Sequence, residues 1–318
     1  MTTSNNVLCD LSHLGLLEIS GADAATFLQG QVTNDVNLLN GSNAHYTAYC
    51  NPKGRMLALF LAFAHYDHLH LQLNRELLEP IMKRLKMYVM RSKVEIKDVS
   101  DSIIKFGLNG MEAASMLEAV FNKAPLFSKI PTEDYELVSL ENGAILKLPS
   151  VNDDARFEIF TDSTNAPLIW EALKNNSKVV EKPHWDWLEI QVGIPDIELK
   201  TQEHFVPQML NLDILNAINF KKGCYTGQEI VARTHYLGSV KRRTYLAETS
   251  IKAMPGDKVM DATQNEVGQI VRVAPNLTGS FDILAELRID AAATGTLGCN
   301  GATLALKTLP YSLEILEI

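Results

Sequence analysis

The feature that most constrains the fold is a change of sequence pattern near Lys241. Before this residue, stretches with apolar residues at helical spacing alternate with short β-favouring stretches. After it, the chain is dominated by short β-rich runs separated by Pro, Gly and Asn, at 244–248, 266–274, 281–289 and 303–308. Closely spaced short strands of this kind are typical of a small barrel. The sequence therefore predicts a mixed α/β region followed by a C-terminal β-barrel.

The part before Lys241 predicts an α+β arrangement of two blocks. Its chain order alternates strands and helices, with turn chemistry between the strands of each block. The whole chain has 318 residues, which is more than a single hydrophobic core organises. We therefore expect two or three domains. The predicted strands are 14–20, 44–50, 55–64, 69–73, 94–99, 103–108 and 157–161, and the predicted helices are 22–29, 75–88 and 111–121, with a hairpin around 141–143.

The net charge limits the classes of partner. The chain carries 29 Lys and Arg against 38 Asp and Glu, a net charge of −9, which excludes a surface that is basic throughout. Two segments, 83–97 and 221–243, are nevertheless basic, each with six basic residues and one acid. One interpretation is a local site for a carboxylate-rich or phosphate-bearing partner. The alternative is a solvated helix face, which is our interpretation of 83–97 taken alone.

The expected location follows from what the sequence does not contain. The longest apolar run, 56–64, has nine residues, whereas a spanning helix needs about 20. The first residues lack the basic and apolar stretches of a secretory signal, and the four cysteines form no disulfide framework. We therefore expect a cytoplasmic protein that does not contact a membrane. Fingerprints of the common hydrolases, kinases and dehydrogenases are missing from the sequence.

The most unusual stretch surrounds Cys224, which two glycines bracket directly after two lysines. Ammonium groups such as that of Lys222 stabilise a thiolate, and Gly223 and Gly227 allow a ligand to approach the backbone closely. Cys224 is therefore a candidate functional thiol. The alternative is that it is a small buried apolar residue, the commoner fate of a free cysteine.

Two aromatic clusters offer further candidates. Trp185 and Trp187 lie near the start of a predicted helix, where an exposed indole would stack on a flat heterocycle. Core packing is the alternative, and helical spacing predicts that Trp187 faces inward while Trp185 has more freedom. His65, His68 and His70 lack a third ligand of another type, so we expect surface histidines and no metal site.

Four segments together resemble the YgfZ family of folate-binding proteins, which are relatives of the glycine cleavage T-protein (aminomethyltransferase). The first is Lys222-Gly223-Cys224-Tyr225-Thr226-Gly227-Gln228-Glu229. The other three are the stretches 27–35 (Phe-Leu-Gln-Gly-Gln-Val-Thr-Asn-Asp), 51–55 (Asn-Pro-Lys-Gly-Arg) and 205–208 (Phe-Val-Pro-Gln), which occur in the family's order. The resemblance spans nearly the whole chain.

The resemblance implies a three-domain ring of T-protein type. The implied domains are a first α/β domain at 1–102, a second α/β region at 103–240 that is intertwined with the first, and a β-barrel at 241–318; one α/β domain is ferredoxin-like. It also implies tetrahydrofolate binding, upkeep of iron–sulfur client proteins and, through them, tRNA modification. The implied site residues are Cys224 and Lys222 for activity, and Trp185, Gln191, Gln208, Tyr225, Gln228, Glu229 and Arg233 for the folate.

Two departures from the family pattern bear on activity. The aminomethyltransferases carry an acid after the Gly-rich turn, but residues 54–59 contain none, which disfavours aminomethyl transfer. Gln191 stands where relatives carry a glutamate that pairs with the pterin, and an amide lacks the charge-assisted pairing of a carboxylate. Glu189 is an alternative partner for the pterin. Arg233 with Lys241, Arg242 and Arg243 is expected to meet a polyglutamyl tail.

The function that we expect is therefore a folate-binding accessory role in iron–sulfur enzyme assembly or maintenance. The alternatives are a folate-dependent one-carbon transferase and an RNA-binding adaptor that uses the two basic segments. Whether the chain catalyses any reaction stays open at this point.

Overall fold

The computed structural model describes residues 6–121, 129–140, 142–236, 238 and 240–313. The chain divides into two compact units whose sequences interleave. The first unit comprises Met1–Leu28, Val36–His45 and Phe60–Trp185, and the second comprises Gln29–Asp35, Tyr46–Leu59 and Asp186–Ile318. Two short N-terminal segments thus belong with the C-terminal part of the chain. The domain boundaries expected at 102/103 and 240/241 stay a prediction.

A five-stranded sheet forms one layer of the first unit, and its strands β3 and β4 continue into the second unit. The predicted meander is confirmed, because β3, β4 and β5 are neighbours in this sheet. The helix α2 (Arg75–Val89) packs on β2, β5 and β6. It buries Leu77, Leu78, Ile81 and Leu85, whose spacing places them on one helix face. The sheet order is β3 (Ala44–Cys50), β4 (Met56–His65), β5 (His68–Asn74), β2 (Leu14–Ser20) and β6 (Glu95–Asp98).

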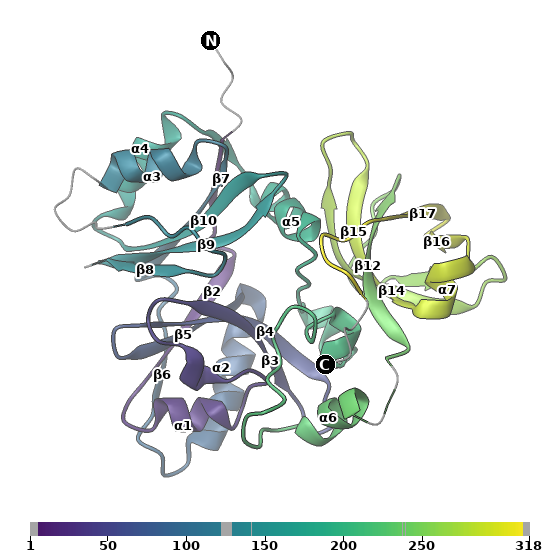
Figure 1. Cartoon of the computed structure of the whole chain (residues 1–318), viewed down its shortest axis with the longest axis horizontal. Helices are drawn as coiled ribbons and strands as arrows, with labels where there is room; N and C mark the ends of the chain where they lie inside the picture. The colour runs from purple at the N-terminus through teal and green to yellow at the C-terminus, as the bar shows by residue number, and fades with distance from the viewer. Residues whose placement is uncertain (1–5, 122–128, 141, 237, 239, 314–318) are drawn as a thin grey trace. The chain divides into compact units, whose positions relative to one another are not determined.

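A six-stranded sheet forms the other layer of this unit. Among its strands β1 and β11 are parallel and the other pairs are antiparallel. The helices α3 (Ala113–Phe121) and α4 (Ala166–Lys174) contact each other and cover one face of the sheet (Figure 1), where they enclose an apolar core. The sheet order is β11 (Lys178–Val180), β1 (Val7–Asp10), β7 (Ile103–Gly110), β10 (Asp154–Asp162), β9 (Gly143–Val151) and β8 (Leu137–Leu140).

The two sheets of the first unit meet through side chains on their facing surfaces. The Phe63 and Phe160 rings lie 4.8 Å apart between centroids, and the Gln72 amide donates to Glu158 over 2.9 Å. Both contacts join residues about ninety positions apart in the chain, so they hold the layers together. Residue 141, at the predicted hairpin between β8 and β9, lies outside the described residues.

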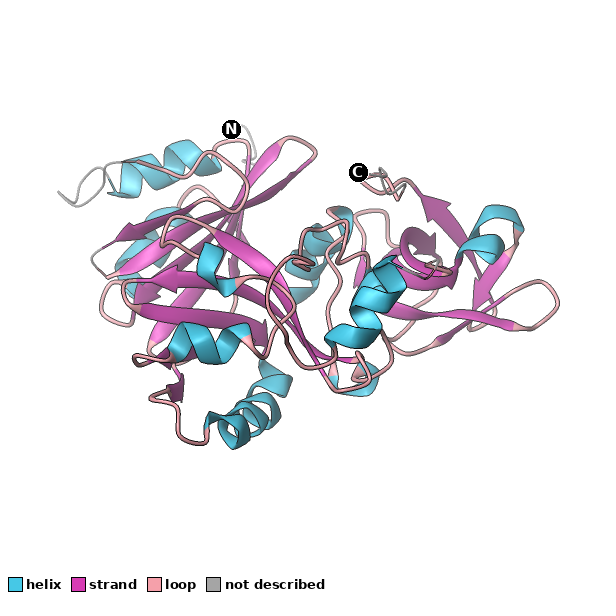
Figure 2. Cartoon of the chain, turned by 60° about the horizontal axis from the view of Figure 1, so that its bottom comes forward, coloured by secondary structure: helices cyan, strands magenta, loops and turns pink. Residues whose placement is uncertain are grey.

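The C-terminal strands of the second unit close into a six-stranded barrel, which confirms the predicted architecture (Figure 2). Its interior is apolar, with Val259, Ile270, Ile283 and Leu287 fully buried. Within the described residues, no helix is long and apolar enough to cross a membrane. The barrel order is β12 (Arg242–Thr249), β15 (Phe281–Arg288), β14 (Glu266–Pro275), β13 (Lys258–Met260), β16 (Leu297–Cys299) and β17 (Ala302–Lys307), with α7 (Ile289–Thr294) after β15. The remaining helical elements are α1 (Ala24–Gln29), α5 (Lys182–Gln191), α6 (Gln228–Tyr236), η1 (Val36–Leu38), η2 (Leu199–Thr201) and η3 (Pro207–Leu210).

Candidate functional site

The site is built on the segment 220–229, which we call the cysteine loop and which leads into α6. The loop lies in the second unit together with the short segments 29–35 and 46–59. Three of the motifs that are far apart in sequence therefore belong to one compact unit. The contacts between them are made largely by backbone atoms, as the following residues show.

Lys222 ties the cysteine loop to the segment 29–35. Its side chain is buried, and the ammonium group donates to the carbonyl oxygens of Gln29, Val32 and Asn34 over 2.8, 2.6 and 2.8 Å. Burial lowers the pKa of this lysine to about 8, and the charge of Asp35 acts in the opposite direction. Since an ammonium group has three N–H donors, all of them are used inside the protein. The geometry thus makes Lys222 a clamp between two loops, and its expected part in the chemistry of the thiol stays a prediction.

Gly227 ties the same loop to the turn 51–54. It has a φ of +84°, and a Cβ atom added to it would lie 2.5 Å from the Asn51 carbonyl oxygen. Gly54 has a φ of +68°, and its added Cβ would lie 2.9 Å from the Ile230 Cβ at the start of α6. Both glycines thus permit backbone-to-backbone packing that a side chain would block. The close approach expected for a ligand at Gly227 is made instead by the protein's own turn.

Cys224 lies between these two anchors and is exposed to solvent. A Cβ added to the preceding Gly223 would meet no atom within 4 Å outside its chain neighbours, so the loop is open at Gly223. Cys9, Cys50 and Cys299 are buried, and burial raises the pKa of Cys50 to about 12 and that of Cys299 to about 11. Cys224 is therefore the accessible thiol of the chain, and the alternative of a small buried residue is excluded.

The other motif residues divide into buried and exposed groups. Tyr225 is buried with its ring 5.1 Å below the Lys222 ammonium, and burial raises the pKa of its hydroxyl. Gln208 is fully buried and donates from Nε2 to the Val231 carbonyl over 2.7 Å, which joins η3 to α6. Glu229 and Arg233 on α6 are exposed, and Gln228 is half-buried. Of the seven expected folate contacts, Glu229 and Arg233 are the ones exposed to solvent.

The orientation predicted for the two tryptophans is wrong. Trp185 is 1% exposed, with Arg156 5.6 Å over its ring, whereas Trp187 is half-buried. A Cβ added to Gly107 would lie 2.4 Å from the Trp185 ring, so this glycine in β7 makes room for the indole. The prediction failed because α5 is buried on more than one side, and helical spacing alone does not say which side is deeper. Trp185 as a folate contact stays a prediction.

Gln191 belongs to a polar network on Asp282 of the barrel strand β15. The Gln191 amide nitrogen donates to Asp282 Oδ2 over 2.8 Å, and Trp187 Nε1 donates to the same oxygen over 2.9 Å. Lys307 and Asn276 bind the other carboxylate oxygen, and these donors hold the pKa of Asp282 below its ordinary value despite burial. Asp282 was not predicted, because an acid within an otherwise apolar strand carries no sequence signal of its partners. The amide of Gln191 is thus fixed in one orientation, with Oε1 as its remaining acceptor.

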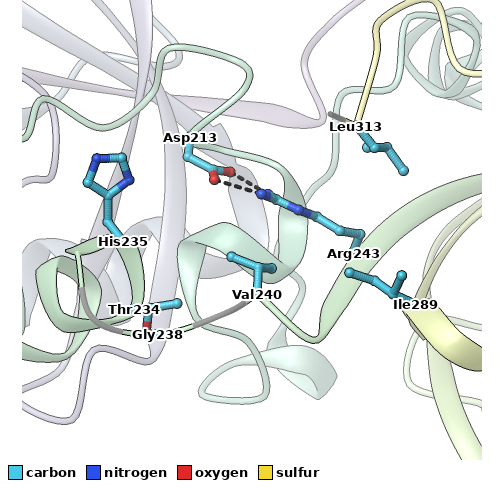
Figure 3. Close-up of a pocket in the computed structure, with 8 residues that line it drawn as sticks. All are labelled: Asp213, Thr234, His235, Gly238, Val240, Arg243, Ile289 and Leu313. Atoms are coloured by element: carbon cyan, nitrogen blue, oxygen red, sulfur yellow. Dashed lines mark hydrogen bonds and ion pairs between the residues drawn. The ribbon is translucent and has the colours of Figure 1, made fainter. Parts of the chain in front are cut away.

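Two of the four basic residues expected to meet a polyglutamyl tail, Arg242 and Arg243, are engaged with carboxylates of the protein, whereas Arg233 and Lys241 are exposed and their part stays a prediction. Arg243 is buried and binds both oxygens of Asp213 over 2.6 and 2.9 Å, as the dashed lines in Figure 3 show. Arg242 binds both carboxylate oxygens of Glu286 over 2.9 and 2.8 Å. A pocket of about 240 Å³ lies beside the ion pair of Arg243 and Asp213, lined by Asp213, Thr234, His235, Gly238, Val240, Arg243, Ile289 and Leu313.

The histidines and acids do not assemble into a metal site. Within the described residues, no group of three or more His, Cys, Asp or Glu side chains is placed to hold a metal ion. The expectation of surface histidines is wrong for His70, which is 2% exposed and stacks on Phe63 with ring centroids 5.1 Å apart. Its position on β5, inside the two-sheet layer, buries it, and burial lowers its pKa to about 3.

The fold and the loop together define a protein of the glycine cleavage T-protein class. A family model described as the GCVT N-terminal domain matches residues 1–184. A crystal structure of the glycine cleavage system aminomethyltransferase T from Bartonella henselae has a TM-score of 0.78 over 97% of this chain and 87% of its own, at 15% identity. That likeness establishes the fold.

Sequence relatives narrow this class. The tRNA-modifying protein YgfZ of Yersinia pestis (strain Pestoides F) is 31% identical over 316 residues, covering 96% of this chain and 92% of its own length. The tRNA-modifying protein YgfZ of Escherichia coli O157:H7 (strain EC4115 / EHEC) is 32% identical and covers 96% and 94%. This chain belongs to the YgfZ family, which confirms the resemblance found in the sequence motifs.

Proposed function

We propose that this protein is a folate-binding accessory factor that supports iron–sulfur enzymes and, through them, tRNA modification, and that it acts in the cytoplasm. The observation that carries the proposal is the presentation of Cys224. The thiol is exposed, while the residues on both sides of it are fixed by the Lys222 clamp and by the packing of Gly227. A loop that is rigid around an accessible thiol is suited to chemistry or contact at that sulfur. The names of the YgfZ relatives support the part in tRNA modification.

We expect Cys224→Ser to abolish the support of iron–sulfur client enzymes in cells without changing the fold. The substitution keeps the size of the side chain and removes the thiol, which is exposed and forms no disulfide. The measurement is client enzyme activity in cells that carry only the variant, with urea unfolding of the purified protein. Cys299→Ala, which removes a buried thiol in the barrel, serves as the matched control and should leave client activity at the native level.

Alkylation of the native protein provides a second readout for the same residue. Iodoacetamide should modify Cys224 well before the three buried cysteines, and the alkylated protein should lose its client support. Normal client activity with Cys224→Ser would remove the thiol from the function and overturn the proposal.

The folate part of the proposal is supported by the aminomethyltransferase fold and by the geometry around Gln191. When bound, a reduced folate would supply a one-carbon carrier. Because the Gln191 amide nitrogen is held by Asp282, its Oε1 offers a neutral acceptor of fixed direction to a pterin N–H. Such a site is expected to bind the pterin with one hydrogen bond where a carboxylate would make a charge-assisted pair.

We expect Gln191→Leu to weaken tetrahydrofolate binding by about tenfold, since one hydrogen bond contributes about 1–1.5 kcal/mol. Anaerobic calorimetric titration of the native protein and the variant measures the effect. Gln264→Leu, on an exposed barrel turn, is the control for the loss of an amide. Equal affinities of native protein and Gln191→Leu would remove Gln191 from the folate site, and no saturable binding by the native protein would refute the folate proposal itself.

A further inference from the structure

A cavity between the two sheets of the first unit has no part in the function proposed above. It has a volume of about 220 Å³ and lies between the turn that joins β4 to β5 and the strands β9 and β10, which Figure 1 labels. Its floor includes Phe63, His70 and Phe160, each 2% exposed, and Tyr66 and Asn142 at its rim are exposed. All of its described lining residues belong to the first unit, and we call it the interlayer cavity.

The fold itself holds the walls of the interlayer cavity in place. On one side, β9 places the small Ala144 opposite Phe160 of β10, so no bulky side chain of β9 fills the space beside that ring. On the other side, the Tyr66 hydroxyl donates to the Leu140 carbonyl over 3.0 Å, which fixes the turn after β4 to the end of β8. The cavity is therefore a built feature of the layered unit.

His70 brings an unused polar atom to the floor of the interlayer cavity. Its ring stacks on Phe63, and its Nδ1 is buried without a hydrogen bond to any described residue. Its Nε2 lies 3.8 Å from Glu18 Oε2, which favours the tautomer with the proton on Nε2 and leaves Nδ1 as an acceptor. A buried nitrogen without a partner costs free energy, and a ligand that donates an N–H would satisfy it.

The charges of the lining select a cation. The ionisable groups among the described lining residues are the carboxylates of Glu18 and Asp162 and three histidines, with no Lys or Arg. Glu18 Oε2 lies 3.0 Å from His68 Nδ1, and no Lys or Arg of the described residues forms an ion pair with this carboxylate. Burial lowers the pKa of His65 and of His70, so both rings are neutral at pH 7. An anionic ligand would therefore meet two carboxylates and no permanent positive charge.

We propose that the interlayer cavity binds a small aromatic amine, with its ring packed against Phe63 and Phe160 and its ammonium group on Glu18 and His70 Nδ1. Aromatic side chains attract cations to their ring faces, and a carboxylate and a ring nitrogen both accept from an ammonium group. The volume sets the size of the ligand. An apolar cavity of about 150 Å³ holds benzene, so about 220 Å³ takes one ring with a short amine chain.

Other ligands and another pocket match this chemistry less well. A metal ion is a weaker match, because no group of three or more His, Cys, Asp or Glu side chains within the described residues is placed to hold one. The pocket beside Arg243 has a similar volume, but its two charged groups, Arg243 and Asp213, bind each other. The interlayer cavity instead combines a carboxylate, an unused buried acceptor and aromatic walls.

The test is calorimetric titration of the full chain with phenethylamine at about pH 7.5, where an alkylamine is charged. We expect saturable binding with a Kd of about 0.1–1 mM, which is the range for a ligand of about nine heavy atoms. 2-Phenylethanol has the same shape without the charge, and it should bind about fivefold or more weakly. Propylamine, which lacks the ring, and phenylacetate, which carries the opposite charge, should show no saturable binding in this range.

Two variants assign the contacts of the ammonium group. Glu18→Gln should weaken phenethylamine binding by about 5- to 10-fold and leave 2-phenylethanol binding unchanged, so that the preference for the amine disappears. Glu118→Gln removes an exposed carboxylate from α3 and is the matched control, which should keep the native preference. His70→Phe keeps a ring beside Phe63 and removes the buried nitrogen. It should weaken amine binding by about fivefold without lowering the midpoint of urea unfolding, whereas a purely structural role of His70 would lower that midpoint.

Three outcomes would overturn the proposal. They are no saturable binding of phenethylamine by the native protein, equal affinities for phenethylamine and 2-phenylethanol, and equal losses in Glu18→Gln and Glu118→Gln, which would place the amine outside the cavity. The interlayer cavity and the cysteine loop belong to different units, so the proposal does not depend on the proposed function. Cys224→Ser should bind phenethylamine like the native protein, and a failure of the amine site is therefore distinguishable from a failure of the thiol function.

Discussion

Lys222→Met is expected to lower the free energy of unfolding by about 3 kcal/mol or more. The substitution keeps most of the aliphatic stem and removes the ammonium group that donates to the carbonyls of Gln29, Val32 and Asn34. Two of those hydrogen bonds are buried, so water replaces the lost donors poorly, and each unsatisfied carbonyl costs about 1–3 kcal/mol. Release of a buried charge offsets part of this loss. Urea unfolding of the native protein and the variant measures the difference.

The adjacent Lys221 is the control for this prediction. It is exposed, and Lys221→Met is expected to change stability by no more than about 0.5 kcal/mol. Lys222→Arg should also destabilise the protein, because a planar guanidinium does not place three donors on three converging carbonyls. A stable Lys222→Met protein with an ordered cysteine loop would show that the clamp contributes little, and a direct role of the ammonium group in the chemistry would then be the better explanation for the lysine.

The role of Lys222 also shows where sequence reasoning stops. The motif around Cys224 predicted an unusual loop and a functional thiol, because glycines and lysines next to a cysteine have local consequences. The three carbonyl partners of Lys222 are about 190 residues away in the chain, and no local pattern names them. Arg243 is a similar case, since its partner Asp213 lies thirty residues upstream and removes it from the expected anion site.

The architecture was more predictable than the site because it depends on periodicity. The strands 44–50 and 69–73, the helix after Arg75 and the barrel runs each carry a pattern with a period of two or 3.6 residues, which local steric and burial preferences impose. Trp185 and Trp187 show the limit of that reasoning. Which of two tryptophans on one helix is buried depends on what packs on each side, here Gly107 and Arg156 on Trp185.

Gly227→Ala is expected to destabilise the protein by about 2–4 kcal/mol and to disorder the cysteine loop. Alanine at a φ of +84° costs about 1–2 kcal/mol, and its Cβ would lie 2.5 Å from the Asn51 carbonyl oxygen and 3.0 Å from the Gly54 Cα. Both neighbours are backbone atoms, so relief requires a shift of the turn 51–54 or of the start of α6. Urea unfolding gives the stability change, and the rate of Cys224 alkylation reports the order of the loop.

Gly223→Ala makes this prediction specific, since it places the same methyl group four residues earlier in the same loop. Its added Cβ meets no atom within 4 Å and its backbone is not left-handed, so we expect a change within about 0.5 kcal/mol and native client support. If both alanines behaved alike, the packing of the cysteine loop on the turn 51–54 would not be what fixes it. A large effect at Gly227 alone would instead link the cysteine loop and the turn 51–54 in one function. Gly227 and Gly54 would then both be required for the two segments to pack closely and for Cys224 to be held at the surface.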